Sequence, residues 1–185
     1  MTVRPVRLFG DPVLRQRADE VVDFDRSLQT LVKDLHETLR DEDGYGLAAT
    51  QLGVLQRVFV WHDGDTEAHI VNPVLDFPDD EEQYGPEGCL SVPGLYFDTK
   101  RRLHTVAKGS DMHGRPVQVV GTDKLARCFQ HETDHLDGVI FIDRLDAGTR
   151  KEAMKAIRHA EWWGQPAPAV RFSPHASHAS HASHR

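Results

Sequence analysis

Apolar positions recur at helical spacing in an early part of the chain, between Asp25 and Arg40. Leucine and valine side chains there fall three or four residues apart, with charged residues at many of the positions between them; the apolar set is Leu28, Leu31, Val32, Leu35 and Leu39. Such a period puts the apolar side chains on one face of a helix. The pattern predicts an amphipathic helix that packs against the core.

The next part of the chain changes to a strand-like pattern. Residues 44–53 are apolar but interrupted by glycine, which predicts a buried or half-buried loop. β-Branched and aromatic residues at 58–61 and 70–71 predict strands. Residues 76–87 are acidic and contain proline, which predicts a solvated loop leading into a compact segment from Glu87 to Gly94.

Strands and a second helix are predicted further along. Short alternating segments between Tyr96 and Val120 predict antiparallel strands, with a hairpin turn at 112–115. Thr122 is a suitable N-cap for the second helix, and Gly138 suits the left-handed position just past its end.

The last part of the chain combines a strand, a third helix and a tail. Residues 139–142 predict a strand, and a capping-box pattern starting at Thr149 predicts a helix that closes near Gly164. Residues 165–185 are rich in Pro, Ala, Ser and His, so we expect a disordered tail after a single domain over residues 1–164. Three helices mixed with strands, without regular alternation, predict an α+β fold.

Composition narrows the class of protein. The 185 residues are 39% hydrophobic, enough for one ordinary core. Because 29 acidic residues outnumber 22 basic ones and no run of Lys or Arg stands out, we do not expect a sequence-specific nucleic-acid binder or an anionic-membrane binder. Two cysteines, Cys89 and Cys128, are too few for a disulfide-stapled secreted scaffold. With no export signal and no apolar stretch of about 18 residues, we expect a cytoplasmic monomer.

The densest chemistry lies in His131-Glu132-Thr133-Asp134-His135, on the predicted second helix. A four-residue spacing puts the two imidazoles on one face, roughly 6 Å apart along the axis, where both can bind one metal ion. Glu132 can then act as general acid/base on a metal-activated water without binding the metal itself. The motif indicates hydrolysis. The alternative is an amphipathic helix with surface histidines and an incidental glutamate.

A catalytic metal site also needs a third protein ligand and an open position. A histidine six residues after His135 would indicate a metzincin, but that position is Phe141, which excludes this class. A downstream glutamate, Glu152 or Glu161, would suit a metallopeptidase. Both, however, fall in the amphipathic last helix, where solvent-facing acids are expected.

Cysteine is the remaining type of ligand. Cys128 shares a helical face with both histidines but precedes His135 by about 10 Å along the axis, so its simplest interpretation is a buried small residue lining the site. Cys89 lies in a glycine-bounded turn, from which a thiolate can point into a cleft. We select Cys89 as the third ligand.

Together with two glycine-rich segments, this arrangement closely resembles the peptide deformylase family. The resemblance extends to about Trp163. Three motifs match in order and spacing, namely Gly44-x-Gly46-Leu47-Ala48-Ala49-Thr50-Gln51, Glu87-Gly88-Cys89-Leu90-Ser91 and Gln130-His131-Glu132-x-Asp134-His135-Leu136-x-Gly138. The resemblance implies antiparallel or mixed sheets around a central metal-binding helix, plus N-terminal and C-terminal helices. It implies removal of the N-formyl group from the formylmethionine of newly synthesised proteins, with release of formate.

The resemblance also implies a role for each matching residue. The implied metal ligands are Cys89, His131 and His135, and the implied proton shuttle is Glu132. Gln51 and the backbone N–H of Leu90 are implied as oxyanion donors, which suits a carbonyl that gains negative charge during attack. Implied substrate-binding residues are Gly44, Tyr45, Gly46, Gly88 and Cys128. The glycines suit a peptide laid alongside as an added strand.

Some positions depart from the usual family pattern or stay open. Three of them change the rim of the substrate pocket and leave the side-chain preference open: Tyr45, Lys124 and Arg127. Asp134 or Asp137 is a candidate acceptor that orients a ligand histidine, and Arg101 is a candidate partner of Asp134. Solvation at the surface is the alternative for each.

The metal and the partners follow from the same resemblance. A thiolate with two imidazoles suits zinc or iron(II), and the resemblance implies iron(II) as the native metal, with zinc, nickel or cobalt as substitutes. It implies nascent formyl-Met polypeptides as substrates and a transient ribosome contact through the C-terminal helix, which carries Arg150, Lys151, Lys155 and Arg158. Two rival classes remain: a metallopeptidase with a glutamate ligand and a non-catalytic metal-binding or peptide-binding relative.

Overall fold

The computed structural model describes residues 3–64 and 66–165. Its helices are α1 (Arg26–Asp41), α2 (Asp123–Leu136) and α3 (Ala147–His159), with short 3-10 helices η1 (Pro12–Arg15), η2 (Ala49–Leu52) and η3 (Phe141–Arg144). Its strands are β1 (Gly46–Ala48), β2 (Val58–Asp63), β3 (Thr66–Asp76), β4 (Glu82–Cys89), β5 (Val92–Arg102), β6 (His104–Ser110) and β7 (Pro116–Thr122).

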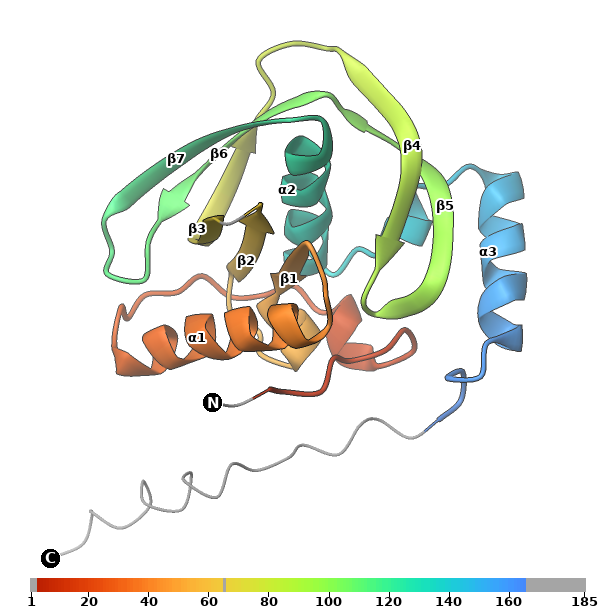
Figure 1. Ribbon diagram of the computed structural model, residues 1–185, viewed down its shortest axis with the longest axis horizontal. Coiled ribbons are helices and arrows are strands. Elements are labelled where there is room, and N and C mark those ends of the chain that lie inside the picture. The colour runs from red at the N-terminus through yellow and green to blue at the C-terminus, as the bar shows by residue number, and fades with distance from the viewer. Residues whose placement is uncertain (1–2, 65, 166–185) are drawn as a thin grey trace, which may run out of the picture.

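The strands form two separate antiparallel sheets. Five strands make one sheet in the order β1-β2-β3-β6-β7, and β4 pairs only with β5. The helix α2 runs between the two sheets, at the centre of the molecule (Figure 1). This is the α+β architecture that the sequence predicted, with the paired histidines on the central helix.

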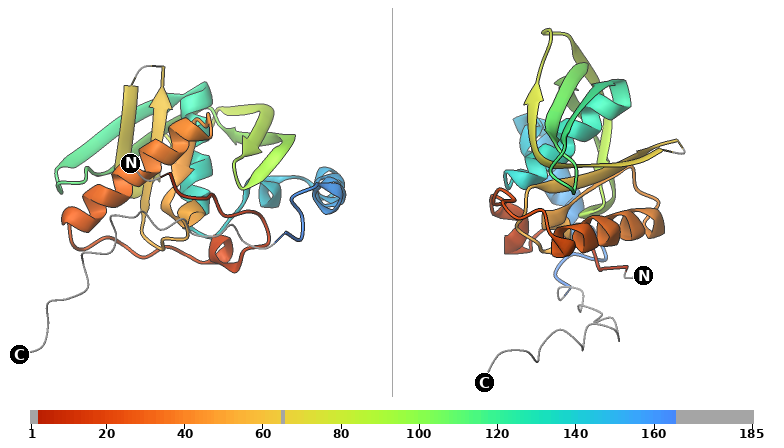
Figure 2. Two further views of the ribbon diagram at one scale, coloured as in Figure 1. Left: turned by 60° about the horizontal axis from the view of Figure 1, so that its bottom comes forward. Right: turned by 90° about the vertical axis from the view of Figure 1, so that its left-hand side faces the viewer.

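Helices cover both faces of the five-stranded sheet (Figure 2). Successive residues of β2 point to opposite faces: Val58 and Val60 join the apolar cluster of α1, whereas Phe59 and Trp61 join the cluster of α2. The five predicted apolar residues of α1 are each at most 6% exposed. Burying one such side chain completely stabilises the fold by about 1.5–3 kcal/mol. The strand β2 is therefore apolar from Val58 to Trp61, where it is covered on both sides.

The helix boundaries follow local capping chemistry. The Asp25 carboxylate accepts hydrogen bonds from the backbone N–H groups of Ser27 and Leu28, which starts α1. Thr122 is the N-cap residue of α2, as predicted. Gly138 has φ +74° two residues beyond that helix, and a Cβ there would lie 2.7 Å from a backbone oxygen. Glycine is required at this turn for both reasons.

The predicted strand at 139–142 is wrong. Phe141 and Ile142 begin the 3-10 helix η3 and are at most 1% exposed. The N–H of Ile140 donates to the carboxylate of Asp143 (3.0 Å), which closes a turn rather than joining a sheet. A short apolar run indicates burial, but local turn bonding decides its backbone conformation.

Two other local predictions are wrong in part. The solvated loop expected at 76–87 is a strand from Glu82 onward, because pairing with β5 stabilises extended backbone whatever its composition. The buried segment 44–53 is not an irregular loop but contains β1 and η2. The strands expected at 58–61 and 70–71 are confirmed within β2 and β3.

The third helix is displaced from its predicted position. It begins at Ala147, because the Asp146 carboxylate accepts from two backbone N–H groups, and it ends at His159 rather than near Gly164. The expected tail lies outside the described residues apart from Gln165. Within the described ranges, no helix has the length and apolar character needed to cross a membrane.

Candidate active site and metal centre

Side chains from two distant segments meet between the sheets. His131 and His135 lie on consecutive turns of α2, and Cys89 ends β4. Cys89 Sγ lies 3.1 Å from His135 Nε2, and one ligand atom from each of the three residues lies within 4.8 Å of the other two. Both imidazoles are buried and Cys89 is half-buried. One sulfur and two nitrogens at this spacing fit a single metal ion with room for a further ligand.

The backbone around Cys89 aims its sulfur at α2. The register of β4 with β5 shifts between Gly88, which pairs with Tyr96, and Cys89, which pairs with Val92. The N–H of Ser91 then donates to Cys89 Sγ (3.4 Å). A Cβ on Gly88 would lie 2.4 Å from the Tyr96 ring, so glycine lets this ring pack against the strand.

Glu87 orients the first imidazole, a role that the sequence analysis missed. Glu87 Oε1 lies 2.7 Å from His131 Nδ1. Burial opposes ionisation of Glu87, but hydrogen bonds from Arg101 and His131 outweigh it and hold the pKa well below its usual range. An ionised Glu87 accepts the Nδ1 proton, which leaves His131 Nε2 to bind a metal. The only signal in the sequence was a glutamate two residues before Cys89.

The two candidate aspartates have other partners. Asp134 accepts from Arg101 Nη1 (2.7 Å), the pairing considered from the sequence. Asp137 accepts from Arg57 Nη1 (2.7 Å). The direct hydrogen-bond partner of His131 Nδ1 is Glu87 and neither of these aspartates.

The electrostatics of the imidazole pair favour a cation. Burial and the neighbouring imidazole lower the pKa of His135 well below its usual value, which favours the neutral form that binds metals. Burial also lowers the pKa of His131, but the Cys89 sulfur and the Glu87 carboxylate raise it by more. A positive charge is therefore stabilised beside the sulfur, and a metal ion supplies one.

Glu132 lies beside the same centre. Its side chain is buried, and Oε2 has no hydrogen-bond partner among the described residues. Burial raises the pKa of Glu132 to about 7. A Cβ on Gly46 would lie 2.6 Å from Glu132 Oε1 and 2.7 Å from Cys128 Sγ, so glycine lets β1 approach the carboxylate closely.

The amide of Gln51 is held against the sulfur. Gln51 is 1% exposed, and its Oε1 accepts from the N–H of Ala48 (2.9 Å). That bond fixes which end of the amide faces the centre, and Nε2 donates to Ser91 Oγ (3.1 Å) and lies 3.7 Å from Cys89 Sγ. A fixed amide donor thus lies beside the three candidate ligands.

Comparison with known proteins agrees with this geometry. A family model described as polypeptide deformylase matches residues 3–151. The chain belongs to the polypeptide deformylase family.

Relatives and solved structures span most of the chain. A peptide deformylase from Parafrankia sp. is 56% identical over 176 residues, covering 95% of this chain and 96% of the relative. One from Acidothermus cellulolyticus is 58% identical over 175 residues, with the same coverage of 95% and 96%. The Thermus thermophilus peptide deformylase structure has a TM-score of 0.80 at 40% identity, covering 85% of this chain and 94% of that one. The structure of Synechococcus elongatus peptide deformylase in complex with actinonin also has a TM-score of 0.80. It is 34% identical to this chain, covering 90% of this chain and 92% of that one.

Family membership confirms the predicted fold and enzyme class. Polypeptide deformylases are metal-dependent hydrolases that remove the N-formyl group from nascent peptides. The two rival classes are therefore wrong. Glu152 and Glu161, the ligands proposed for a metallopeptidase, are exposed and do not belong to the metal-binding group found in the described residues.

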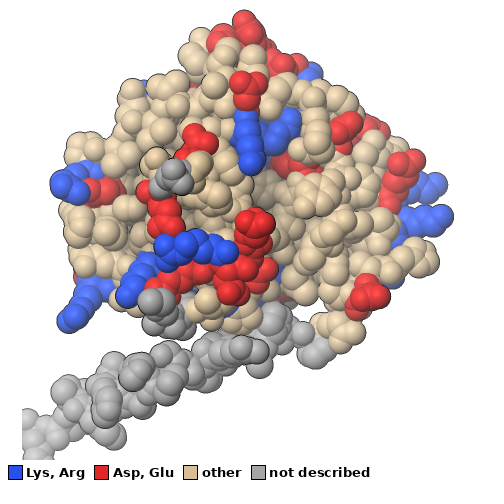
Figure 3. Space-filling view, viewed as in Figure 1, with Lys and Arg blue, Asp and Glu red and all other residues tan. Residues whose placement is uncertain are grey.

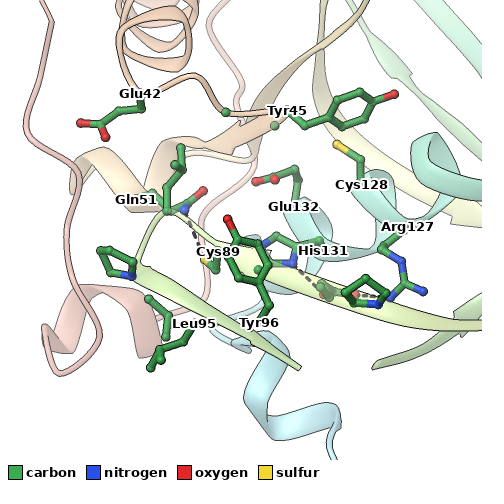
Figure 4. Close-up of a pocket in the computed structure, with 18 of the residues that line it drawn as sticks. Glu42, Tyr45, Gln51, Cys89, Leu95, Tyr96, Arg127, Cys128, His131 and Glu132 are labelled. Atoms are coloured by element: carbon green, nitrogen blue, oxygen red, sulfur yellow. Dashed lines mark hydrogen bonds and ion pairs between the residues drawn. The ribbon is translucent and has the colours of Figure 1, made fainter. Parts of the chain in front are cut away.

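A cavity of about 550 Å³ opens beside the candidate metal centre. Figure 4 shows lining side chains that come from η2 (Gln51), the end of β4 (Cys89) and α2 (His131 and Glu132). The residues implied as substrate-binding or oxyanion donors all line this cavity: Gly44, Tyr45, Gly46, Gln51, Gly88, Leu90 and Cys128. Glu132 and His131 lie at the same wall. The two glycine-rich motifs thus meet the histidine motif around one space.

The rim of the cavity carries opposite charges on opposite sides (Figure 3). Glu42 and Asp43 lie at the end of α1, and Lys124 and Arg127 lie on α2. The three departures from the family pattern are engaged with other groups. Lys124 Nζ lies 4.0 Å from the centre of the Tyr45 ring, and Arg127 Nη1 donates to Glu87 Oε2 (2.8 Å). The Arg127 guanidinium therefore faces β4, away from Glu132 and Cys128 (Figure 4).

Proposed function

We propose that this deformylase acts on the N-terminal formylmethionine of newly synthesised proteins through a metal ion held by Cys89, His131 and His135. The observation that carries the proposal is the convergence of these three ligand atoms within 4.8 Å, beside the cavity that Glu132 and Gln51 line. The soft donor set suits iron(II), which we propose as the native metal, and accepts zinc, nickel or cobalt. When bound, the ion supplies a Lewis acid that activates water and polarises the formyl oxygen.

Glu132 moves the proton in this reaction. Its unpartnered Oε2 is free to accept a proton from the attacking water and to return it to the amine that leaves. A pKa of about 7 makes both protonation states accessible near neutral pH. The proton affinity of this carboxylate therefore suits a group that takes up a proton and returns it within one catalytic cycle.

Gln51 and the backbone N–H of Leu90 stabilise the oxyanion. The formyl oxygen gains negative charge as water attacks, and donors held in place before the reaction stabilise that charge without reorganising. Gln51 Nε2 is held in place by the bond from Ala48 to the other end of its amide. Leu90 follows the proposed ligand Cys89 directly in the chain and lines the same cavity.

The substrate peptide binds as a strand between the two sheets. β1 is an edge of the five-stranded sheet, and β4 is an edge of the two-stranded sheet. An extended peptide between them gains backbone hydrogen bonds from exposed edges. Gly44, Tyr45, Gly46, Gly88 and Cys128 line the cavity that receives this peptide.

We further propose a cytoplasmic monomer that touches the ribosome transiently through α3. Four basic residues of this helix are exposed: Arg150, Lys151, Lys155 and Arg158. The helix lies at the far side of the β4–β5 sheet from α2 (Figure 1), so docking there leaves the cavity open. Exposed basic side chains suit a phosphate-rich surface.

The test is formate release from a formyl-Met peptide by anaerobically purified iron protein, with an acetyl-Met peptide as the control. We expect formate from the first and no acetate from the second. A Cys89→Ala variant should lose both metal and activity, and full metal content and activity in that variant would contradict the ligand set.

Metal identity has a separate test. Iron(II) beside a thiolate is open to oxidation, so peroxide should inactivate the iron-loaded enzyme faster than the nickel-loaded enzyme. Equal survival of the two forms would argue against iron as an oxygen-sensitive native metal.

A further inference from the structure

A chain of hydrogen-bonded charged residues connects the face of α2 that is turned away from the cavity to the proposed metal centre. Arg144 of η3 donates through Nε and Nη2 to both oxygens of Asp134 (3.0 and 2.5 Å). Arg101 Nη1 donates to Asp134 Oδ2 (2.7 Å), and its Nε and Nη2 hold both oxygens of Glu87 (3.0 and 2.6 Å). Glu87 in turn accepts from His131 Nδ1. We name these five residues the Arg144–His131 relay.

The interior of the relay is buried, and its outer end is accessible. The side chains of Arg101, Glu87 and Asp134 are 4%, 3% and 10% exposed, whereas that of Arg144 is 50% exposed. Burial opposes the charge on Arg101, but the Glu87 carboxylate outweighs it and raises the pKa of Arg101 further. Buried charges of this kind depend on one another, because each lacks water as an alternative partner.

The geometry makes the position of Glu87 depend on Asp134. One planar guanidinium, that of Arg101, bridges the two carboxylates, so a rotation that releases one also moves the other. Glu87 Oε1 accepts from both Arg101 and His131, so a shift of this oxygen turns the imidazole. Changes in such outer partners of a ligand histidine alter metal affinity by about 10–100-fold.

We propose that Asp134 and Arg144 are positioning residues of the metal centre. Acting through Arg101 and Glu87, they hold the His131 ring in the orientation that presents Nε2 to the ion. Neither residue lines the catalytic cavity. The inference rests on the proposed function, in which His131 is a metal ligand.

The test compares Asp134→Asn with Asp137→Asn. Both substitutions remove one carboxylate charge near the end of α2, and both aspartates pair with an arginine whose side chain is at most 10% exposed. Of the two aspartates, Asp134 shares its arginine partner, Arg101, with Glu87. The partner of Asp137 is Arg57, whose Nη1 also donates to a backbone carbonyl (3.4 Å). The second variant therefore controls for loss of an ion pair at this helix end, at a carboxylate that is more exposed (42% against 10%).

Full-length protein loaded with cobalt(II) provides the readout. We expect Asp134→Asn to lower cobalt affinity in chelator competition by about tenfold or more and to shift the visible absorption of the bound ion. Asp137→Asn should have the same cobalt affinity and the same visible absorption as the parent. The proposal is overturned if Asp134→Asn also matches the parent, or if the two variants change alike.

Arg144 keeps the proposal testable if Asp134→Asn does not fold. Its half-exposed side chain tolerates replacement, so we expect Arg144→Met to fold and to bind cobalt more weakly than the parent. Arg144→Lys should have an intermediate cobalt affinity, because lysine keeps the positive charge but cannot form the bidentate hydrogen bond to Asp134. Parental values in Arg144→Met would contradict the relay.

Failure of the proposed function gives a different result. If His131→Ala binds cobalt as tightly as the parent, the ligand set itself is wrong. If His131→Ala loses cobalt while Asp134→Asn and Arg144→Met do not, only the relay is wrong.

Discussion

Two clefts lie on opposite faces of α2, and they differ in how their charged groups are paired. The catalytic cavity of about 550 Å³ contains a carboxylate oxygen of Glu132 without a partner among the described residues. The rear cleft is larger, about 730 Å³. Its charged side chains, however, are engaged in ion pairs, as with Arg57 and Asp137, Arg144 and Asp134, or Lys100 and Glu82.

Volume therefore does not identify the reactive face of this helix. A carboxylate with two strong partners is stabilised in one geometry and one charge state. A buried carboxylate without a partner costs free energy and persists where its reactivity is used. This difference supports the proposals that the cavity face of α2 carries the chemistry and that ion pairs on its other face position the proposed ligands.

Neighbouring residues on the helix give the sharpest way to break this comparison. Glu132 Oε2 and Thr133 Oγ1 are both buried without a partner among the described residues, but they line the catalytic cavity and the rear cleft respectively. Glu132→Gln should lower kcat by about 10²–10⁴-fold, because the proton shuttle is lost, while metal content stays unchanged. Formate release and metal analysis check both.

Thr133→Val is the matched control for that change. It removes an unsatisfied hydroxyl at nearly constant volume, so we expect unchanged kcat and equal or slightly higher stability. A large loss of kcat in Thr133→Val, or near-parental turnover in Glu132→Gln, would remove the distinction between the two faces.

The buried glutamines offer a second matched pair. Gln51 is 1% exposed in front of α2, and Gln130 is 8% exposed behind it, where its amide bonds to the backbone of Arg102 and to Thr105. Gln51→Leu should lower kcat by about 10²–10³-fold, as loss of an oxyanion donor does. Gln130→Leu should instead lower the free energy of unfolding by about 1–3 kcal/mol, because its backbone partners lose a buried bond. Kinetics and denaturant unfolding on both variants test this split.

The smallest predicted effect lies away from both clefts. His69 Nε2 accepts a hydrogen bond from the N–H of Met112 (3.0 Å), so its imidazole must be neutral in the folded state. Burial lowers the pKa of His69 below its usual value of 6.5. The lowered folded pKa means that this contribution to stability is present above about pH 6.5 and is lost as the pH falls through the folded pKa.

Thermal unfolding at pH 7.5 and pH 5.5 checks this sign. The parent should lose more stability between these pH values than His69→Gln, whose side-chain oxygen accepts the same bond without titrating. His159→Gln, at an exposed position on α3, should behave like the parent. An equal pH response of all three proteins would contradict the assignment.

The amino-acid sequence by itself indicated the chemistry that we propose for the site. The spacing of His131 and His135 places both imidazoles on one face of any helix that contains them, and Glu132 follows the first ligand directly. The period of apolar residues in α1 likewise determined which of its faces is buried. These features are local, so the geometry of one helix is enough to derive them.

Only the tertiary structure decided what meets across the molecule. Cys89 lies 46 positions before His135, and a register shift in the β4–β5 pair brings its sulfur to the imidazole. The pairing of Glu87 with His131 has the same origin, since the two residues lie 44 positions apart. Strand register and long-range hydrogen bonds depend on partners distant in sequence, so no local pattern specifies them.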